Sequence, residues 1–360
     1  MLLLIIPKRL ILKLVVDSAT LEPPLPMDQL YPLLLLPEFH ERIWGTRDLS
    51  AFYPSHKIGN EPIGEVWLTG EGCRVANGAL QGRTLGEVST QFGEKLNGTL
   101  APQPRFPLLV KIIFPRDKLS VQVHPDDPGA RKAGLPCGKT ECWYVLDAAP
   151  GAKVGLGLKT GTRRKEIEAS IHGKNMEQLL NWIPVKSGDM IYVDAGTVHA
   201  IGPDCVLLET QQNSDTTYRL YDYGRPRELH IDRGLEAVKE VTRAGKVKSR
   251  GGNGRVVLIS SPSFIVDKML LKDTKTLSTE EAAGRSSPHC IIGLRGCGII
   301  ECDGTPAISL GRGEAAVVPA AVGAYRIRPQ WEFEFVRAAL PISASEPETE
   351  SPAQLASAAR

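Results

Sequence analysis

Three short segments carry side chains that could bind a metal ion. In the first, LSVQVHPDD (residues 119–127), strand alternation places Ser120, Gln122 and His124 on one face and the apolar residues on the other. Taken alone, a polar stripe of this kind more often faces solvent than lines a hydrophilic cavity. A metal site therefore needs further donors from elsewhere in the chain.

Two later segments provide such donors. KTECWYVLD (139–147) places Lys139 and Glu141 on one strand face, and GDMIYVDAGTVHAIG (188–202) gives a strand, a tight turn and His199 at the start of the return strand. Two imidazoles, a carboxylate and an amide oxygen suit a divalent ion, and a mixed nitrogen and oxygen set suits zinc or another first-row metal. The three segments together predict one metal site on the inner wall of a β-structure.

The elements that must position these residues have a period of two. A near-continuous apolar run at 108–114 and strict alternation at 119–124 are typical of strands, and the Pro, Gly and Asp turns between such runs indicate a sandwich or barrel. We therefore expect a mainly β protein. Two short helices are predicted at 163–171 and 175–183, and a third at 232–241.

Composition changes divide the chain further. Residues 245–254 (GKVKSRGGNG) have the composition of a linker, and short strands resume over 255–340. We therefore expect a first β-domain over 27–244 with a short helical insert at about 160–184, and a second, smaller β-domain over 255–340. Residues 341–360 are predicted to be a disordered tail because they contain almost no bulky apolar group.

Charge and cysteine content limit the partners and the compartment. With 43 Lys and Arg against 41 Asp and Glu, the net charge is +2, which argues against a nucleic-acid partner. Seven cysteines without regular spacing favour a reducing compartment, hence the cytoplasm. The apolar runs within residues 1–26 are too short for a membrane span, and they lack the order of a secretory signal. We expect a monomer or a weak homo-oligomer.

The order of these motifs resembles a known family. Gln-x-His, a later Glu and then Gly-x5-Asp-x-Gly-x2-His resemble the two motifs of a cupin barrel, with Gln122 where many cupins have the first His. With Ser-x-Gln-x-His-Pro-Asp and ETQQNSDTTYR (209–219), the chain resembles the short bacterial form of type I mannose-6-phosphate isomerase, from about Leu30 to Leu340. Members of this form begin near residues 31–45, so we expect Met27 to be the start and residues 1–26 an upstream extension.

The resemblance implies two cupin-like β-barrels, jelly-roll sandwiches of which only the first binds metal. It implies a metal-dependent aldose-ketose isomerase that interconverts D-mannose 6-phosphate and D-fructose 6-phosphate through an enediolate, linking mannose metabolism to glycolysis and GDP-mannose supply. One divalent ion, expected to be Zn²⁺, would be bound by Gln122, His124, Glu141 and His199. Arg219 would be the catalytic arginine, because its fixed charge and planar donors suit an oxyanion. A structural ion pair with Asp215 or Asp222 is the alternative.

The base and the phosphate contacts are predicted less directly. Glu209 could face the cavity and act as the base if burial raises its pKa. Lys139, Asp215 and a metal-bound hydroxide are alternative bases. The chain contains no Gly-x4-Gly-Lys-Ser/Thr phosphate loop, so side chains must bind the substrate, with Ser120, Lys139, Asp215 and Arg225 as candidates.

Two other functions are compatible with this set of residues. A non-catalytic sugar-binding cupin would use the metal only to orient its ligand. A metal-dependent oxygenase would use His124, Glu141 and His199 as a two-histidine, one-carboxylate triad for iron. The fourth ligand Gln122 and the segment around Arg219 favour the isomerase.

Overall fold

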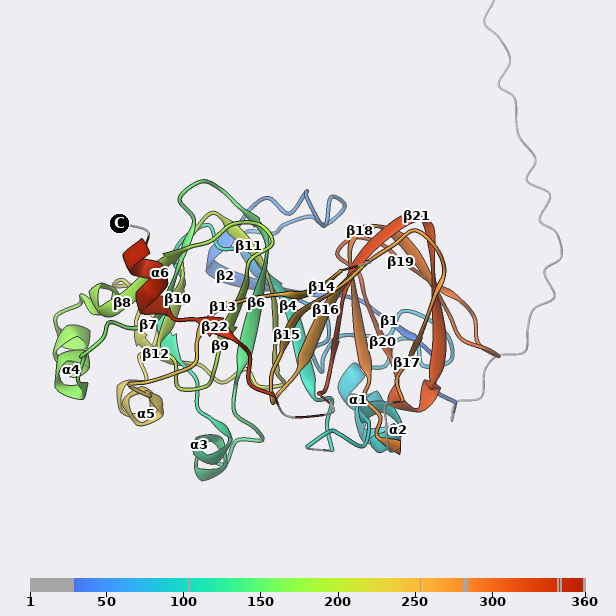
Figure 1. Ribbon diagram of the computed structural model, residues 1–360, viewed down its shortest axis with the longest axis horizontal. Helices are drawn as coiled ribbons and strands as arrows, with labels where there is room; N and C mark the ends of the chain where they lie inside the picture. The colour runs from blue at the N-terminus through green and yellow to red at the C-terminus, as the bar shows by residue number, and fades with distance from the viewer. Residues whose placement is uncertain are drawn as a thin grey trace, which may run out of the picture.

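A computed structural model of the protein describes residues 29–102, 104–252, 254–280, 284–341, 343 and 345–358. Over this part of the chain, two β-barrels lie side by side, and a few short helices are attached to them (Figure 1). The mainly β fold with two cupin-like barrels is thus confirmed. The predicted extension at 1–26 and the predicted start at Met27 lie outside the described residues.

The first barrel is built from two sheets whose inner faces meet. In the described residues, one has five strands in the order β12 (Tyr218–Tyr221), β5 (Val121–Val123), β10 (His199–Ile201), β7 (Lys153–Leu158) and β8 (Leu180–Pro184). The other has eight strands in the order β2 (Glu38–Thr46), β3 (Ile63–Trp67), β4 (Leu108–Ile113), β11 (Cys205–Gln212), β6 (Glu141–Ala148), β9 (Met190–Val193), β13 (Gly245–Val247) and β22 (Thr349–Glu350).

The second barrel is built from one nine-stranded sheet of the described chain. Its main path is β1 (Leu33–Leu35), β20 (Ala315–Val318), β18 (His289–Glu301), β21 (Ala324–Ala339), β16 (Ile265–Leu271), β15 (Arg255–Ser260) and β14 (Arg250–Gly252). Two further strands lie off this path: β17 (Lys275–Ser278) pairs with β21, and β19 (Ile308–Leu310) pairs with β18.

The helices lie outside the sheets, and only some match the predictions. The described chain forms α1 (Leu85–Phe92), α2 (Glu94–Asn97), α3 (Asp127–Lys132), α4 (Arg164–His172), α5 (Ile231–Ala237) and α6 (Pro352–Ala358), with 3₁₀ turns η1 (Met176–Leu179) and η3 (Ala320–Val322). The helix predicted at 163–171 is α4. The third predicted helix is α5, which ends early. None of the described helices has the length and apolarity needed to cross a membrane.

The prediction of a helix at 175–183 is wrong. After η1, the chain enters β8, which pairs with β7 through Val154 and Ile183. The local sequence favours a helix, but backbone pairing with β7 and burial of Leu180 and Ile183 favour a strand. The predicted helical insert thus consists of one helix, one 3₁₀ turn and one strand.

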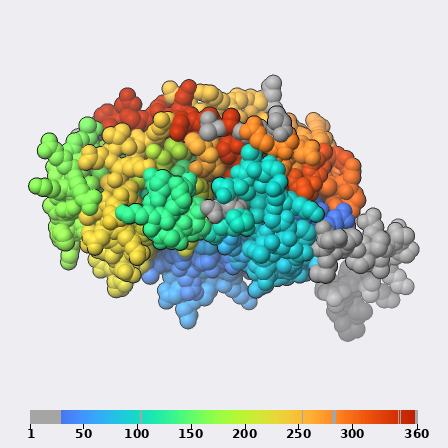
Figure 2. Space-filling view, turned by 90° about the horizontal axis from the view of Figure 1, so that it is seen from below, coloured from blue at the N-terminus to red at the C-terminus, as the bar shows by residue number. Residues whose placement is uncertain are grey.

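The predictions of a linker at 245–254 and of a disordered tail at 341–360 are also wrong. Part of the supposed linker forms β13 and β14, and the tail forms β22 and α6. β22 pairs with β13, and the acidic tail makes ion pairs with the basic segment, including Arg250–Glu348 at 2.6 Å and Lys248–Glu350 at 3.7 Å. Figure 2 shows this C-terminal segment, drawn red, along one edge of the molecule.

The two barrels share a strand and a buried apolar cluster across their boundary. β1 belongs to the first predicted domain by sequence, yet it pairs with β20 of the second barrel, Leu33 opposite Val317. One buried apolar cluster contains residues of both barrels, for example Leu108 and Phe106 together with Cys290 and Val336. The predicted boundary at residue 244 therefore does not separate two independent cores.

Candidate metal centre and active site

One row of cross-strand neighbours lies on the five-stranded sheet. His199 of β10 is opposite Gln122 of β5, and Gln122 is opposite Arg219 of β12. Side chains at such opposed positions lie on the same face of the sheet. His124 follows the last residue of β5, so it shares the face of Gln122 as the sequence predicts. This row forms one wall of the site.

The turn before β10 brings His199 into this row. β9 ends at Val193, and the chain reverses through Gly196, whose φ of +95° favours glycine over residues with a side chain. Thr197 donates its hydroxyl hydrogen to Asp194 Oδ1 at 2.8 Å, which closes the turn. His199 is then the first residue of the return strand.

The eight-stranded sheet forms the opposite wall. Glu209 of β11 is opposite Lys111 of β4 on one side and Trp143 of β6 on the other, and Glu141 begins β6. These charged side chains are almost completely buried. Because buried charges require partners, the wall must meet donors and acceptors from the other sheet.

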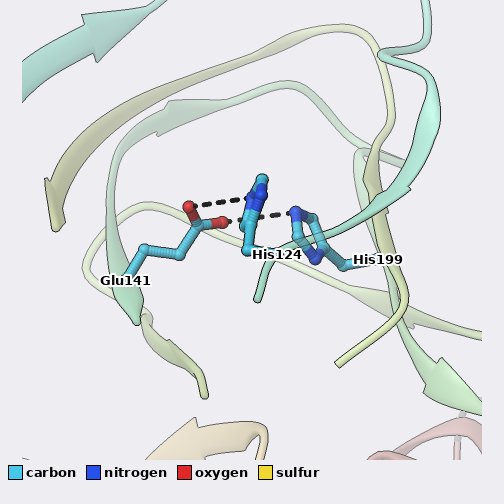
Figure 3. Close-up of side chains that lie close together, drawn as sticks. All are labelled: His124, Glu141 and His199. Atoms are coloured by element: carbon cyan, nitrogen blue, oxygen red, sulfur yellow. Dashed lines mark ion pairs between the residues drawn. The ribbon is translucent and has the colours of Figure 1, made fainter. Parts of the chain in front are cut away.

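His124, Glu141 and His199 converge between the walls (Figure 3). His124 Nε2 lies 3.4 Å from Glu141 Oε2, and His199 Nε2 lies 3.3 Å from Glu141 Oε1. One donor atom from each residue can be chosen so that all lie within 4.8 Å of one another. All three side chains are at most 1% exposed.

Backbone carbonyls determine which imidazole nitrogen faces the cluster. His124 Nδ1 lies 2.9 Å from the carbonyl oxygen of Thr216, and His199 Nδ1 lies 2.9 Å from that of Thr197. A carbonyl oxygen can only accept, so each Nδ1 must carry the hydrogen. In the neutral ring, Nε2 then presents a lone pair toward Glu141. This is the hydrogen-bonding pattern of metal-binding histidines.

The charge states of the cluster fit a cation at its centre. Burial lowers the pKa of both His124 and His199, so both rings are neutral near pH 7. Burial alone would raise the pKa of Glu141, but the neighbouring Lys139 ammonium lowers it below its usual value, so this group is a carboxylate. Two Nε2 lone pairs therefore face carboxylate oxygens, and none of His124 Nε2, Glu141 Oε1 and Oε2 forms a hydrogen bond. A divalent cation makes this arrangement favourable.

Gln122 lies beside the cluster as a possible fourth ligand. Its Nε2 donates to His199 Nε2 at 3.1 Å, and its Oε1 accepts from Ser120 Oγ at 3.1 Å. Oxygen is the ligand atom of an amide, so metal binding requires the amide turned end for end. The Ser120 hydroxyl can accept as well as donate, so it can hold either orientation.

A cavity of about 350 Å³ adjoins this cluster. Gln122 lines it, as do five basic and three acidic side chains: Arg42, Lys111, Lys139, Arg219, Arg227, Glu65, Glu209 and Asp215. The excess of basic side chains favours an anionic ligand.

The comparisons with known proteins agree with this site. The family model for phosphomannose isomerase type I, catalytic domain, matches residues 33–146, which include Gln122, His124 and Glu141. A mannose-6-phosphate isomerase of Streptococcus mutans is 34% identical over 317 residues, which is 84% of this chain and 95% of that protein. This chain belongs to the mannose-6-phosphate isomerase family.

Other members of the mannose-6-phosphate isomerase family show the same relationship. The isomerase ManA of Bacillus subtilis is 42% identical over 220 residues, which cover 58% of this chain and 68% of that protein. A crystal structure of the Bacillus subtilis enzyme matches with a TM-score of 0.75 at 29% identity, over 85% of this chain and 99% of that chain. A zinc-bound mannose 6-phosphate isomerase shares the fold, with a TM-score of 0.67 at 15% identity over 86% of this chain and all of the other.

Arg219 of this mannose-6-phosphate isomerase family member faces the cavity without a carboxylate partner. Its Nη1 donates to the carbonyl oxygen of Glu228 at 2.8 Å, and its buried Nε has no hydrogen bond. Among the ion pairs of the described residues, Asp222 binds Arg225 and Arg227 instead. The structural ion pair considered from the sequence is therefore not formed.

Glu209 also lies where the sequence analysis places it, at the cavity wall. Its Oε1 accepts from Trp143 Nε1 at 3.1 Å, and its Oε2 lies 2.8 Å from Lys111 Nζ. Burial and the neighbouring Glu141 raise the pKa of Glu209. A raised pKa is what a general base near neutral pH requires.

The predicted substrate contacts are only partly brought together. Ser120, Lys139 and Asp215 line the cavity, with Lys139 Nζ 3.3 Å from Glu141 Oε2. Arg225 is not among the lining residues. It binds Asp117, Asp222 and the backbone of Lys118, so its donors are already engaged outside the cavity lining.

Several cavity residues were not identified from the sequence. Lys111, Glu65, Arg42 and Arg227 all line the cavity. One signal was available for two of them: Lys111 is the single charged residue of LLVKIIF (108–114), and Glu65 lies within IGEVW (63–67). A charge within a buried strand must be paired or functional.

Proposed function

We propose that this chain catalyses the interconversion of D-mannose 6-phosphate and D-fructose 6-phosphate with one divalent metal ion, Zn²⁺, bound by Gln122, His124, Glu141 and His199. The observation that carries the proposal is the pair of buried imidazole lone pairs aimed at the Glu141 carboxylate. Family membership supplies the substrate class.

The reaction moves a proton between C1 and C2 through an enediolate. A divalent metal held by His124, Glu141, His199 and Gln122 would supply Lewis-acid polarisation of the substrate. Arg219 has a free Nε donor and a permanent charge, so it stabilises negative charge as it develops on the substrate. Lys111 and Lys139 add positive charge at the same wall.

Glu209 is the proposed base that carries the proton between the two carbons. Trp143 and Lys111 hold its carboxylate, and its raised pKa brings it closer to the working pH. Asp215 also lines the cavity, but its side chain is exposed to solvent, and no lysine or indole holds it as Lys111 and Trp143 hold Glu209 among the described residues.

The phosphate is proposed to be held by the basic side chains of the cavity together with Ser120. Five basic against three acidic lining groups leave the cavity positive before metal binds. Because Arg225 is engaged in ion pairs away from this lining, it is the weakest of the predicted contacts.

A coupled assay for fructose 6-phosphate from mannose 6-phosphate tests the proposal. Turnover should be present in the purified protein, disappear after chelation and return on addition of Zn²⁺. Affinity for the sugar phosphate without turnover would instead indicate a non-catalytic sugar-binding protein. Oxygen uptake with bound iron would indicate the oxygenase.

A cytoplasmic location is proposed on the basis of the thiols. All seven cysteines are free, including four that are buried. Free thiols in this number persist in a reducing compartment.

A further inference from the structure

A row of alternating charges crosses one wall of the cavity. Arg42 of β2 contacts Glu65 of β3 through two bonds of 3.2 Å each. Glu65 Oε2 lies 3.7 Å from Lys111 Nζ, and Lys111 Nζ lies 2.8 Å from Glu209 Oε2. The row runs from the partly exposed Arg42 to the buried Glu209, which we propose as the base.

Glu65 is held firmly at its place in the row. Besides Arg42, the Trp67 indole Nε1 donates to Glu65 Oε2 at 2.8 Å. The side chain of Glu65 is 11% exposed and that of Lys111 is 4% exposed. Arg42 donates from Nε and Nη2 to the two oxygens of Glu65, a bidentate pair that fixes the orientation of this carboxylate.

The strand register shows that Lys111 is shared between two carboxylates. Lys111 is directly opposite Glu209 on β11, whereas on β3 its opposite residue is Trp67 and Glu65 is two positions away. The Lys111 ammonium therefore reaches Glu65 along the diagonal. Without this second carboxylate, Lys111 would have only Glu209 as a close ion-pair partner among the described residues.

We propose that Glu65 is a positioning residue for the isomerisation: it holds the Lys111 ammonium between two carboxylates, and this fixes the place of the Glu209 carboxylate at the cavity wall. Glu65 acts through Lys111 and does not itself contact the reacting carbons. The proposal rests on the proposed function, because it assigns a task within that reaction.

The substitution E65Q tests this role. It keeps the shape of the side chain and removes the charge that draws Lys111 away from Glu209. We expect kcat to fall about 10- to 100-fold, because a misplacement of about 1 Å at a catalytic group costs up to about 100-fold. KM for mannose 6-phosphate should stay within about threefold, and zinc content should equal that of the wild type.

A matched control is E71Q. Glu71 also pairs with an arginine, Arg105 at 2.9 Å, in the same half of the chain, but it does not line the cavity. Its substitution should leave kcat and KM unchanged. A kcat for E65Q within twofold of that of E71Q would overturn the proposal.

A second variant, E65D, keeps the carboxylate charge but shortens the side chain by one methylene. We expect full zinc content and a kcat reduced several-fold, because the distance to Lys111 increases while the buried charges stay balanced. If E65Q loses zinc or unfolds, E65D decides: reduced kcat with full zinc supports positioning, and unchanged kcat refutes it. Absence of turnover in the wild type would instead refute the proposed function itself.

Discussion

The imidazoles of His124 and His199 are each held at one nitrogen. Nδ1 lies against a backbone carbonyl, and Nε2 faces Glu141, so the second nitrogen of each ring is placed to bind an ion. Removing a ring therefore deletes a ligand but leaves the sheets paired through their backbones. This separation between folding and binding makes single-residue tests informative.

Replacing His199 by Ala is expected to strip the metal and abolish turnover while the fold is retained. Metal content by atomic absorption, far-UV circular dichroism and the coupled assay measure the three effects. H172A is the control, because His172 lies exposed at the end of α4. Full activity in H199A would mean that the ligand set is misassigned.

Replacing Arg219 by Ala is expected to leave the metal bound and to lower kcat by at least ~100-fold, the usual scale for losing one preorganised charge-stabilising donor. R116A, which removes a mostly exposed arginine paired with Asp204, should change kcat less than twofold. Steady-state kinetics on metal-loaded proteins provides the comparison. A near-normal rate in R219A would return this residue to a structural role.

The sequence could predict the grouping of His124, Glu141 and His199 because strand alternation fixes which side chains share a face of a sheet. Lys111 and Glu65 escape the same reasoning. Their partners are distant in the chain: Lys111 pairs with Glu209, and nothing local reveals that pairing. Ion pairs of this kind follow from strand order, which a single sequence does not provide.

At the scale of elements, the structure differs most from the prediction where a segment pairs with strands or charged residues that are distant in the sequence. The segment at 175–183 has helical spacing, but only its first half forms a 3₁₀ turn, and residues from Leu180 onward join β8, which pairs with β7. The tail has little apolar content, yet Glu348 pairs with Arg250 of β14 and Glu350 pairs with Lys248, which lies between β13 and β14. Leu355 packs against a core cluster of the first barrel.

The apolar contact of α6 predicts a measurable contribution to stability. L355A should lower the free energy of unfolding by about 1–2 kcal/mol, less than for a fully buried leucine because Leu355 is only partly buried. Urea denaturation measures the change. S357A, on the exposed side of α6, should change it by less than ~0.5 kcal/mol. Equal stability of L355A and the wild type would show that α6 is not held by this contact.

At the scale of the whole molecule, buried charges make stability depend on pH. Burial alone would raise the pKa of Glu65, but Lys111 and Arg42 outweigh it and lower the pKa from 4.5 to about 2. The carboxyl is thus ionised in the folded protein where it would be protonated in the unfolded chain. Its contribution is complete above about pH 5 and is lost as the pH falls toward 2.

We therefore expect protonation of Glu65 to lower the free energy of unfolding of the metal-free protein by about 3 kcal/mol between pH 5 and pH 2. This value follows from the difference between the pKa of 4.5 in the unfolded chain and about 2 in the folded protein. Denaturant unfolding at several pH values in the presence of a chelator measures the slope. The E65Q variant should show a shallower loss over the same interval. Parallel curves for the two proteins would contradict the assignment of this carboxyl.

β1 has a consequence for how the protein is made. Leu33 lies opposite Val317, so a strand near the beginning of the described chain completes a sheet whose other members come from its last third. On the ribosome, the roughly 280 residues between these partners take about 15 to 55 seconds to translate. During that interval, the apolar segment Leu33–Leu35 lacks the β20 strand with which it pairs in the folded protein.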